Sequence, residues 1–110
     1  MKEGLLYIKY LEQAENLYRL QYGSYTSNLA NLGLDLPPTT NWTYSVLVQG
    51  DTARIDMINQ QRTIYIEYEV ARRRYKCNSK KSARMCLLSE VVKDCGERVS
   101  GEWEYHCQHK

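Results

Sequence analysis

Four cysteines are the residues in this chain whose type and spacing point most directly to a chemical role. Cys77, Cys86, Cys95 and Cys107 lie in the last third of the 110 residues, separated by eight, eight and eleven residues. A zinc ribbon or finger needs closely spaced pairs of ligands, and these intervals do not provide them. An even number of cysteines in one loop-rich region is typical of disulfides formed in an oxidising compartment. The sequence therefore predicts two disulfides, and no metal or other cofactor.

Four cysteines can pair in three ways. We predict the pairs Cys77–Cys86 and Cys95–Cys107, because neighbouring cysteines close small loops around a short helix and around the C-terminal tail. By the chain-entropy estimate, each loop stabilises the folded state by roughly 3 kcal/mol. Such crosslinks would hold the tail, which has few large aliphatic residues to bury.

A cluster of basic residues is the second chemical feature. Residues 72–86 contain seven cations and no acid, a local charge of +7. Such a cluster can attract an anion such as DNA phosphate or a lipid head group. More often it is a solvated strand end and loop, or a patch that pairs with acids of a neighbouring subunit, and we favour these interpretations. The candidate contact residues are Arg72, Arg73, Arg74, Lys76, Lys80, Lys81 and Arg84.

The remaining candidates are less specific. His106 and His109 flank Cys107, but surface histidines in a tail are commoner than metal ligands. Glu67 and Glu69 are two residues apart in a predicted strand, and we interpret them as a solvated outward face. The sequence has no Ser-His-Asp ordering, Gly-rich phosphate loop or metal motif. We therefore predict no catalytic residues, no metal site and no enzymatic activity.

An amphipathic helix is predicted over about residues 5–22. Its apolar residues recur at three- and four-residue steps, and Gly23 suits a helix end. The predicted polar face includes Glu12 and Glu15. The apolar residues at 5–8 should extend beyond the sheet and stay uncovered. The stripe that should pack on the sheet is Leu11, Ala14, Leu17 and Tyr18.

Three strands follow, at about residues 42–49, 52–59 and 63–71. Each alternates apolar and polar residues, which is typical of a sheet covered on one face. Because the connections are short, the strands should form an antiparallel meander. The residues predicted to face the helix are Val46, Val48, Ile55, Met57, Ile64, Ile66 and Tyr68.

We predict that residues 1–110 form one α+β domain, because 43% hydrophobic and 25% charged residues are typical of a globular protein. A helix–sheet connection, the αβ-loop, spans residues 23–41 and should contain a short helical turn. A short helix is predicted at 82–92, within a Cys-bounded tail at 77–107. The sequence shows no signal peptide and no apolar run of ~20 residues. We therefore expect this chain to be a piece of a longer exported protein.

Residues 14–37, AENLYRLQYGSYTSNLANLGLDLP, carry a family resemblance. This block, followed by a three-stranded meander and a Cys-bounded tail, resembles type IV pilins and type II secretion pseudopilins. The resemblance implies a lollipop-shaped subunit whose helix continues upstream in a hydrophobic half. In the family, that half anchors the subunit in the bacterial inner membrane and then packs in the filament core.

The implied partners are other pilin subunits in a helical filament, the pilus or secretion assembly machinery, and the membrane through the upstream helix. The implied location is an extracellular filament or the periplasm. Two alternatives stay open: a DNA-binding minor pilin that uses the cluster at 72–84, or an unrelated secreted disulfide-bonded binding module. The isolated chain should be a monomer.

Overall fold

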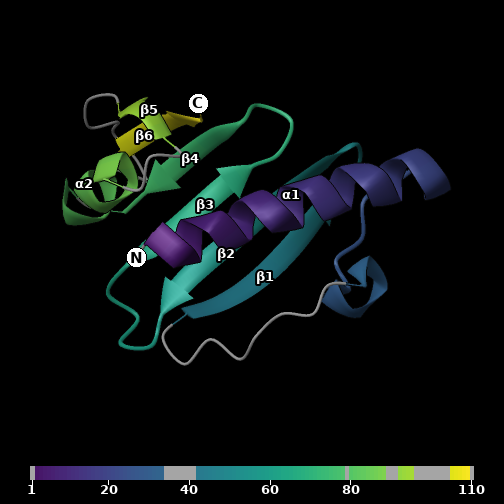
Figure 1. Ribbon diagram of the computed structural model, residues 1–110, viewed down its shortest axis with the longest axis horizontal. Helices are drawn as coiled ribbons and strands as arrows, with labels where there is room; N and C mark the ends of the chain where they lie inside the picture. Colours follow the sequence, from purple (N-terminus) through teal and green to yellow (C-terminus); the bar gives the residue numbers. More distant parts are fainter. Residues whose placement is uncertain (1, 34–41, 79, 89–91, 96–104, 110) are drawn as a thin grey trace.

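The computed structural model describes residues 2–33, 42–78, 80–88, 92–95 and 105–109. Within these ranges one long helix crosses one face of an antiparallel sheet (Figure 1). The elements are α1 (Lys2–Tyr22), the 3-10 helix η1 (Leu29–Leu32), β1 (Trp42–Gln49), β2 (Thr52–Asn59), β3 (Tyr65–Glu69), β4 (Arg74–Cys77), α2 (Lys80–Leu88), β5 (Val92–Cys95) and β6 (Tyr105–His109).

The described strands form a six-stranded sheet in the order β1-β2-β3-β4-β6-β5. The pairing of β1 with β2 runs without a gap from Trp42 opposite Asn59 to Gln49 opposite Thr52. The predicted α+β architecture, with a helix on an antiparallel sheet, is confirmed. The predicted number of strands, three, is too low, because β4, β6 and β5 extend the sheet beyond β3.

The predicted strand register is confirmed by the burial of the inward-facing residues. Ile66 and Tyr68 are completely buried, as are Ile55 and Met57 on the neighbouring strand. A slip by one residue would have turned this whole set toward solvent. The alternation in the sequence therefore identified the covered face of β1, β2 and β3.

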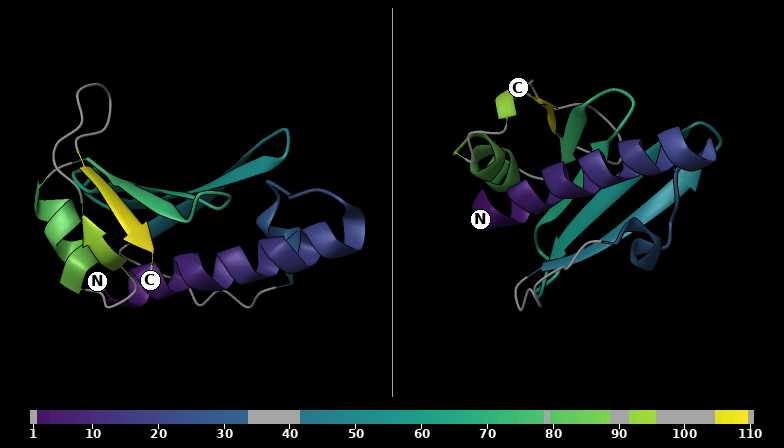
Figure 2. Two further views of the ribbon diagram at one scale, coloured as in Figure 1. Left: turned by 90° about the horizontal axis from the view of Figure 1, so that it is seen from above. Right: turned by 45° about the vertical axis from the view of Figure 1, so that its right-hand side comes forward.

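The face of α1 that packs on the sheet differs from the prediction. Leu5, Ile8 and Leu11 are completely buried, so the N-terminal end of the helix is covered. Leu17, by contrast, is 58% exposed. Figures 1 and 2 show the reason: the sheet lies beneath the first turns of α1, whereas the last turns project past it. Helix α2 also contacts α1.

The end of α1 follows the sequence prediction. Gly23 has a φ of 83° and donates its backbone N–H to the carbonyl of Arg19 at 2.7 Å. This left-handed position closes the helix at little cost for a residue without Cβ. The predicted helical turn in the αβ-loop is η1, and Asn28 caps it by accepting a hydrogen bond from the N–H of Ala30. Residues 34–41 lie outside the described ranges.

The C-terminal third is more regular than predicted. Helix α2 covers Lys80–Leu88 instead of residues 82–92, and Val92 begins strand β5. Strand β6 pairs with both β4 and β5. The backbone of the Cys-bounded tail therefore belongs in part to the sheet, instead of relying on crosslinks alone. Residues 96–104 lie outside the described ranges.

Candidate functional site

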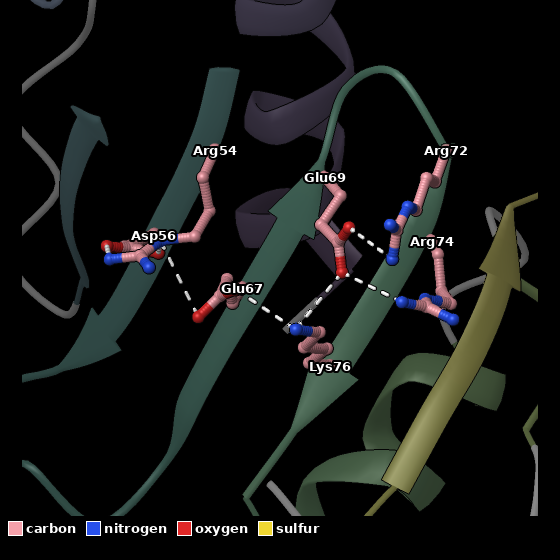
Figure 3. A network of polar contacts seen from close by, with 7 residues as sticks. All are labelled: Arg54, Asp56, Glu67, Glu69, Arg72, Arg74 and Lys76. Atoms are coloured by element: carbon pink, nitrogen blue, oxygen red, sulfur yellow. Dashed lines mark hydrogen bonds and ion pairs between the residues drawn. The ribbon is translucent and has the colours of Figure 1, made fainter. Parts of the chain in front are cut away.

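A network of charged side chains covers the face of the sheet opposite α1 (Figure 3). The register brings the side chains together, because Asp56, Glu67 and Lys76 stand opposite one another on β2, β3 and β4. Glu69 and Arg74 are likewise opposite each other. The outward positions of these three adjacent strands therefore bring acids and bases side by side.

Glu69 binds three cations. Its Oε1 lies 3.1 Å from a terminal guanidinium nitrogen of Arg74 and 3.2 Å from Nζ of Lys76. Its Oε2 lies 3.5 Å from Arg72. Burial alone would raise the pKa of the Glu69 carboxyl, but the hydrogen bonds and charges of Arg74 and Lys76 outweigh it and lower the pKa. Glu69 is thus held in its charged form.

Glu67 and Asp56 are more deeply placed. Glu67 lies 3.5 Å from Nε of Arg54 and 3.8 Å from Nζ of Lys76. Asp56 accepts two hydrogen bonds from Arg54, at 3.0 and 3.1 Å. Burial has the largest effect on both carboxyl groups and raises the pKa of each. The neighbouring cations act in the opposite direction but do not outweigh it. The prediction of a solvated face is wrong for Glu67, whose side chain is only 5% exposed.

The described part of the basic cluster does not form one free cationic patch. Arg72, Arg74 and Lys76 all pair with Glu69. Arg73 hydrogen-bonds to Tyr68 instead, on the face covered by α1. Arg84 is exposed on α2. The side chains of Lys80 and Lys81 lie outside the description.

Two buried acids on α1 were missed by the sequence analysis. Tyr68 donates its hydroxyl to Oε2 of Glu12, and Oε1 of Glu15 accepts the backbone N–H of Thr26 at 2.9 Å. Burial raises the pKa of Glu15 and outweighs the opposing hydrogen bond from Thr26. Glu12 and Glu15 continue the face of Leu5 and Ile8 at helical spacing. That spacing was the signal that could have placed both acids inward.

The last turns of α1 present large apolar side chains to solvent. Leu17 is 58% exposed, Leu20 84% and Tyr22 66%. Beside them, a shallow groove of about 260 Å³ lies between α1 and η1. It is lined by Tyr10, Gln13, Ala14, Leu17, Tyr18, Gln21, Asn31 and Leu32. The exposed apolar residues at this end of α1, together with the groove beside them, are candidates for a contact surface.

Three of the four cysteines gather in the interior. The sulfurs of Cys77 and Cys86 are 3.3 Å apart. The sulfur of Cys77 is also 3.7 Å from that of Cys107, which is disulfide-bonded. Cys95 stands opposite Cys107 in the pairing of β5 with β6. The side chains of His106 and His109 lie outside the description, so their predicted surface position stays a prediction.

Comparison with known families identifies the class of protein. The chain matches the family described as type IV pilin-like G and H over residues 2–84, and it therefore belongs to this type IV pilin-like family. The resemblance inferred from residues 14–37 is thus confirmed. No curated protein and no solved structure matches the chain significantly. Among the described helices, none has the length and apolar character needed to cross a membrane.

Proposed function

We propose that this chain is a structural subunit of a type IV pilus or of a type II secretion pseudopilus. In this proposal it acts by polymerisation and has no chemistry of its own. Membership of the type IV pilin-like family supports a pilin-like role. The third interpretation, an unrelated secreted module, is wrong because the family is now known.

The observation that best supports the proposal is the set of exposed apolar side chains at the end of α1. Leu17, Leu20 and Tyr22 are solvated in the single chain, and covering them would remove apolar area from water. Each fully covered leucine contributes about 1.5–3 kcal/mol. The sequence analysis placed the uncovered apolar surface at residues 5–8. The uncovered surface is instead at the opposite end of the helix, beside the αβ-loop.

In a helical filament the contacts are head-to-tail, so two different patches on each subunit must be complementary. We expect residues 24–38 of the αβ-loop and residues 95–107 of the tail to supply them. The described part of the loop supports the first patch, because Asn31 and Leu32 line the groove with α1. Residues 34–38 and 96–104 of these patches lie outside the described ranges.

The family membership supports a pilus location, outside the cell or in the periplasm. Anchoring in the inner membrane before assembly, and recognition by the pilus or secretion machinery, belong to this proposal.

The DNA-binding alternative is less well supported. Arg72, Arg74 and Lys76 are engaged by one carboxylate, and phosphate contacts would have to compete with these ion pairs. Arg73 is directed to Tyr68. We therefore interpret the described part of the cluster mainly as support for the outer face of the sheet.

A substitution in the full gene tests the proposal. Leu17→Ser combined with Leu20→Ser should reduce incorporation of the subunit into surface filaments while the subunit still folds. Leu47→Ser is the matched control, because Leu47 is also an exposed leucine but lies on β1. Equal incorporation of both variants would exclude the end of α1 as a contact surface.

A further inference from the structure

The αβ-loop is attached to α1 at Thr26. The loop turns back so that η1 contacts α1 (Figure 2), and Oε1 of Glu15 accepts the backbone N–H of Thr26 at 2.9 Å. The hydroxyl oxygen of Thr26 accepts two further bonds, from the backbone N–H of Asn28 at 3.1 Å and from the side-chain amide of Asn31 at 3.2 Å. Asn28 caps η1, and Asn31 lies in it. The position of η1 against α1 therefore depends on a short chain of contacts that begins at Glu15.

The carboxyl group of Glu15 has a hydrogen bond at only one of its oxygens. The residue is completely buried, and within the described part of the chain its Oε2 has no hydrogen-bond partner. A buried polar atom without a partner is costly, and a buried charge without a partner costs far more. The site therefore accommodates the neutral carboxyl better than the carboxylate. Burial accordingly raises the pKa of Glu15, although the hydrogen bond from Thr26 acts in the opposite direction.

The charged groups one helical turn away from this carboxyl have partners of their own. Glu12 accepts the hydroxyl of Tyr68 on β3. Arg19 donates to the hydroxyl of Tyr25 at 3.1 Å, and its guanidinium lies 5.1 Å from the centre of that ring. The four residues of η1 are not ionisable. On β1, β2 and β3 the ionisable side chains that face α1 are Tyr44 and Tyr68, and burial raises the pKa of both.

We propose that Glu15 is a proton-dependent clamp, which holds the αβ-loop on α1 while its carboxyl is neutral and releases the loop when it ionises. Release gives the carboxylate access to water and exposes Tyr25 and Thr26, which are buried in the closed loop. Because Asn31 and Leu32 line the groove beside α1, release also opens that groove. The sheet need not unfold, since openings of this kind are local. The inference does not depend on the proposed filament role.

The direction of the pH dependence follows from the environment of Glu15. A folded pKa that is raised stabilises the closed loop fully below the pKa of the open loop, and this advantage is lost as pH rises through the folded pKa. The loop should therefore be closed in acid and should open with rising pH.

Nuclear magnetic resonance of the labelled wild-type chain tests the clamp without a substitution. The carboxyl carbon of Glu15 reports its ionisation, and the backbone amides of Thr26 and Asn31 report the loop. We expect the carboxyl to titrate above the usual range of a glutamate, and the two amides to change with the same midpoint. A carboxyl that titrates at its usual pKa, or amides that do not follow it, would overturn the clamp.

Amide hydrogen exchange distinguishes release of the loop from a change of charge alone. At each pH the wild type is compared with Glu15→Gln, which keeps an oxygen acceptor but cannot ionise, so the intrinsic pH dependence of exchange cancels. Exchange at Thr26 in the wild type, relative to the variant, should rise with pH by about tenfold for each unit by which the pKa is raised. Thr26 should also be less protected than Ile66 in β3. A ratio that does not change with pH, or equal protection of the two amides, would exclude a local release.

The substitution Thr26→Val tests how the clamp reaches the groove. This variant keeps the backbone N–H that Glu15 accepts, but it lacks the hydroxyl that joins Asn28 and Asn31. The amide at position 26 should still follow the titration of Glu15, whereas the amide of Asn31 should no longer do so. Ser27→Ala, at the exposed neighbouring position, is the matched control and should behave as the wild type. An unchanged response of Asn31 in Thr26→Val would overturn the proposed coupling through this hydroxyl.

Discussion

Glu15 and Thr26 are joined by a hydrogen bond of 2.9 Å, in which Oε1 of Glu15 accepts the backbone N–H of Thr26. Both residues are buried. The left-handed turn at Gly23 reverses the chain and brings Thr26 back alongside α1. Thr26 then accepts the N–H of Asn28 at its hydroxyl, and Asn28 caps η1. This one contact therefore fixes the start of the αβ-loop, which forms one wall of the proposed contact surface.

Removing the acceptor should destabilise the domain. Glu15→Ala leaves the buried N–H of Thr26 without its partner, and we expect a loss of about 1–3 kcal/mol in the free energy of unfolding. Denaturation by urea measures this loss. Asn16→Ala is the control, because Asn16 is the exposed neighbour on the same helix. A loss in Glu15→Ala no larger than in the control would show that the contact contributes little.

The pH dependence of the same site follows from the direction of its pKa shift. Burial raises the pKa of Glu15 in the folded state, so the protonated form is favoured there. The resulting stability is complete below the unfolded pKa and is lost as pH rises through the folded pKa. Glu15→Gln retains an oxygen acceptor but cannot ionise.

The wild type should therefore lose stability relative to Glu15→Gln as pH rises from about 4 to about 8. Denaturation of both proteins across this range measures the difference. A difference that is constant, or that changes in favour of the wild type, would contradict the inferred shift.

Glu69, on the outer face of the sheet, should show the opposite pH dependence. The ion pairs of Glu69 lower its pKa, so their contribution is present above the unfolded pKa and is lost as pH falls through the folded pKa. Glu69→Gln should cost about 1 kcal/mol at neutral pH, and less in high salt because the pairs are partly solvated. Asp51→Asn, in the exposed β1–β2 turn, is the control. Equal effects of the two substitutions would show that the ion pairs of Glu69 are not stabilising.

The strand predictions succeeded because alternation is a local signal. Ile66 and Tyr68 could be assigned to the covered face from their own segment. The same signal was present in β4, where the buried residues Tyr75 and Cys77 alternate with the partly exposed Arg74 and Lys76. The charge of the basic cluster obscured it. These cations are accommodated on the sheet by ion pairs with acids of β3. The pairs depend on the register between β3 and β4.

The helix face could not be predicted from α1 alone. Glu12 and Glu15 are charged residue types, and their burial depends on Tyr68 and Thr26, which come later in the chain. Leu17 fits an apolar stripe, but it is 58% exposed, and the last turns of α1 project past the sheet (Figure 2). The disulfide pairing predicted from loop size stays a prediction, although the positions of Cys77 and Cys86 are compatible with it.

DNA binding by the isolated chain should be absent or very weak. We expect no retardation of duplex DNA at low salt, because Arg72, Arg73, Arg74 and Lys76 already have protein partners. A mobility-shift assay measures this. Retardation that weakens steeply with salt and disappears in Arg72→Ala, Arg73→Ala and Arg74→Ala combined would support the DNA-binding alternative.

The isolated chain should be a monomer of 13.0 kDa at micromolar concentration. Stable complexes usually bury ~1,200 Å² or more in total, and we expect the peripheral contacts of this domain to be weak without the upstream half of the helix. Sedimentation velocity measures the mass. A stable dimer whose formation is abolished by Leu20→Ser would mean that this surface closes on itself instead of propagating a filament.

The most direct test of the proposed function is the composition of native filaments. Filaments sheared from cells that express the full gene should contain this subunit, as shown by mass spectrometry and by antibody labelling along their length. A deletion strain provides the control for labelling. If filaments assemble normally and the subunit is never found in them, the account of this chain as a filament subunit is contradicted.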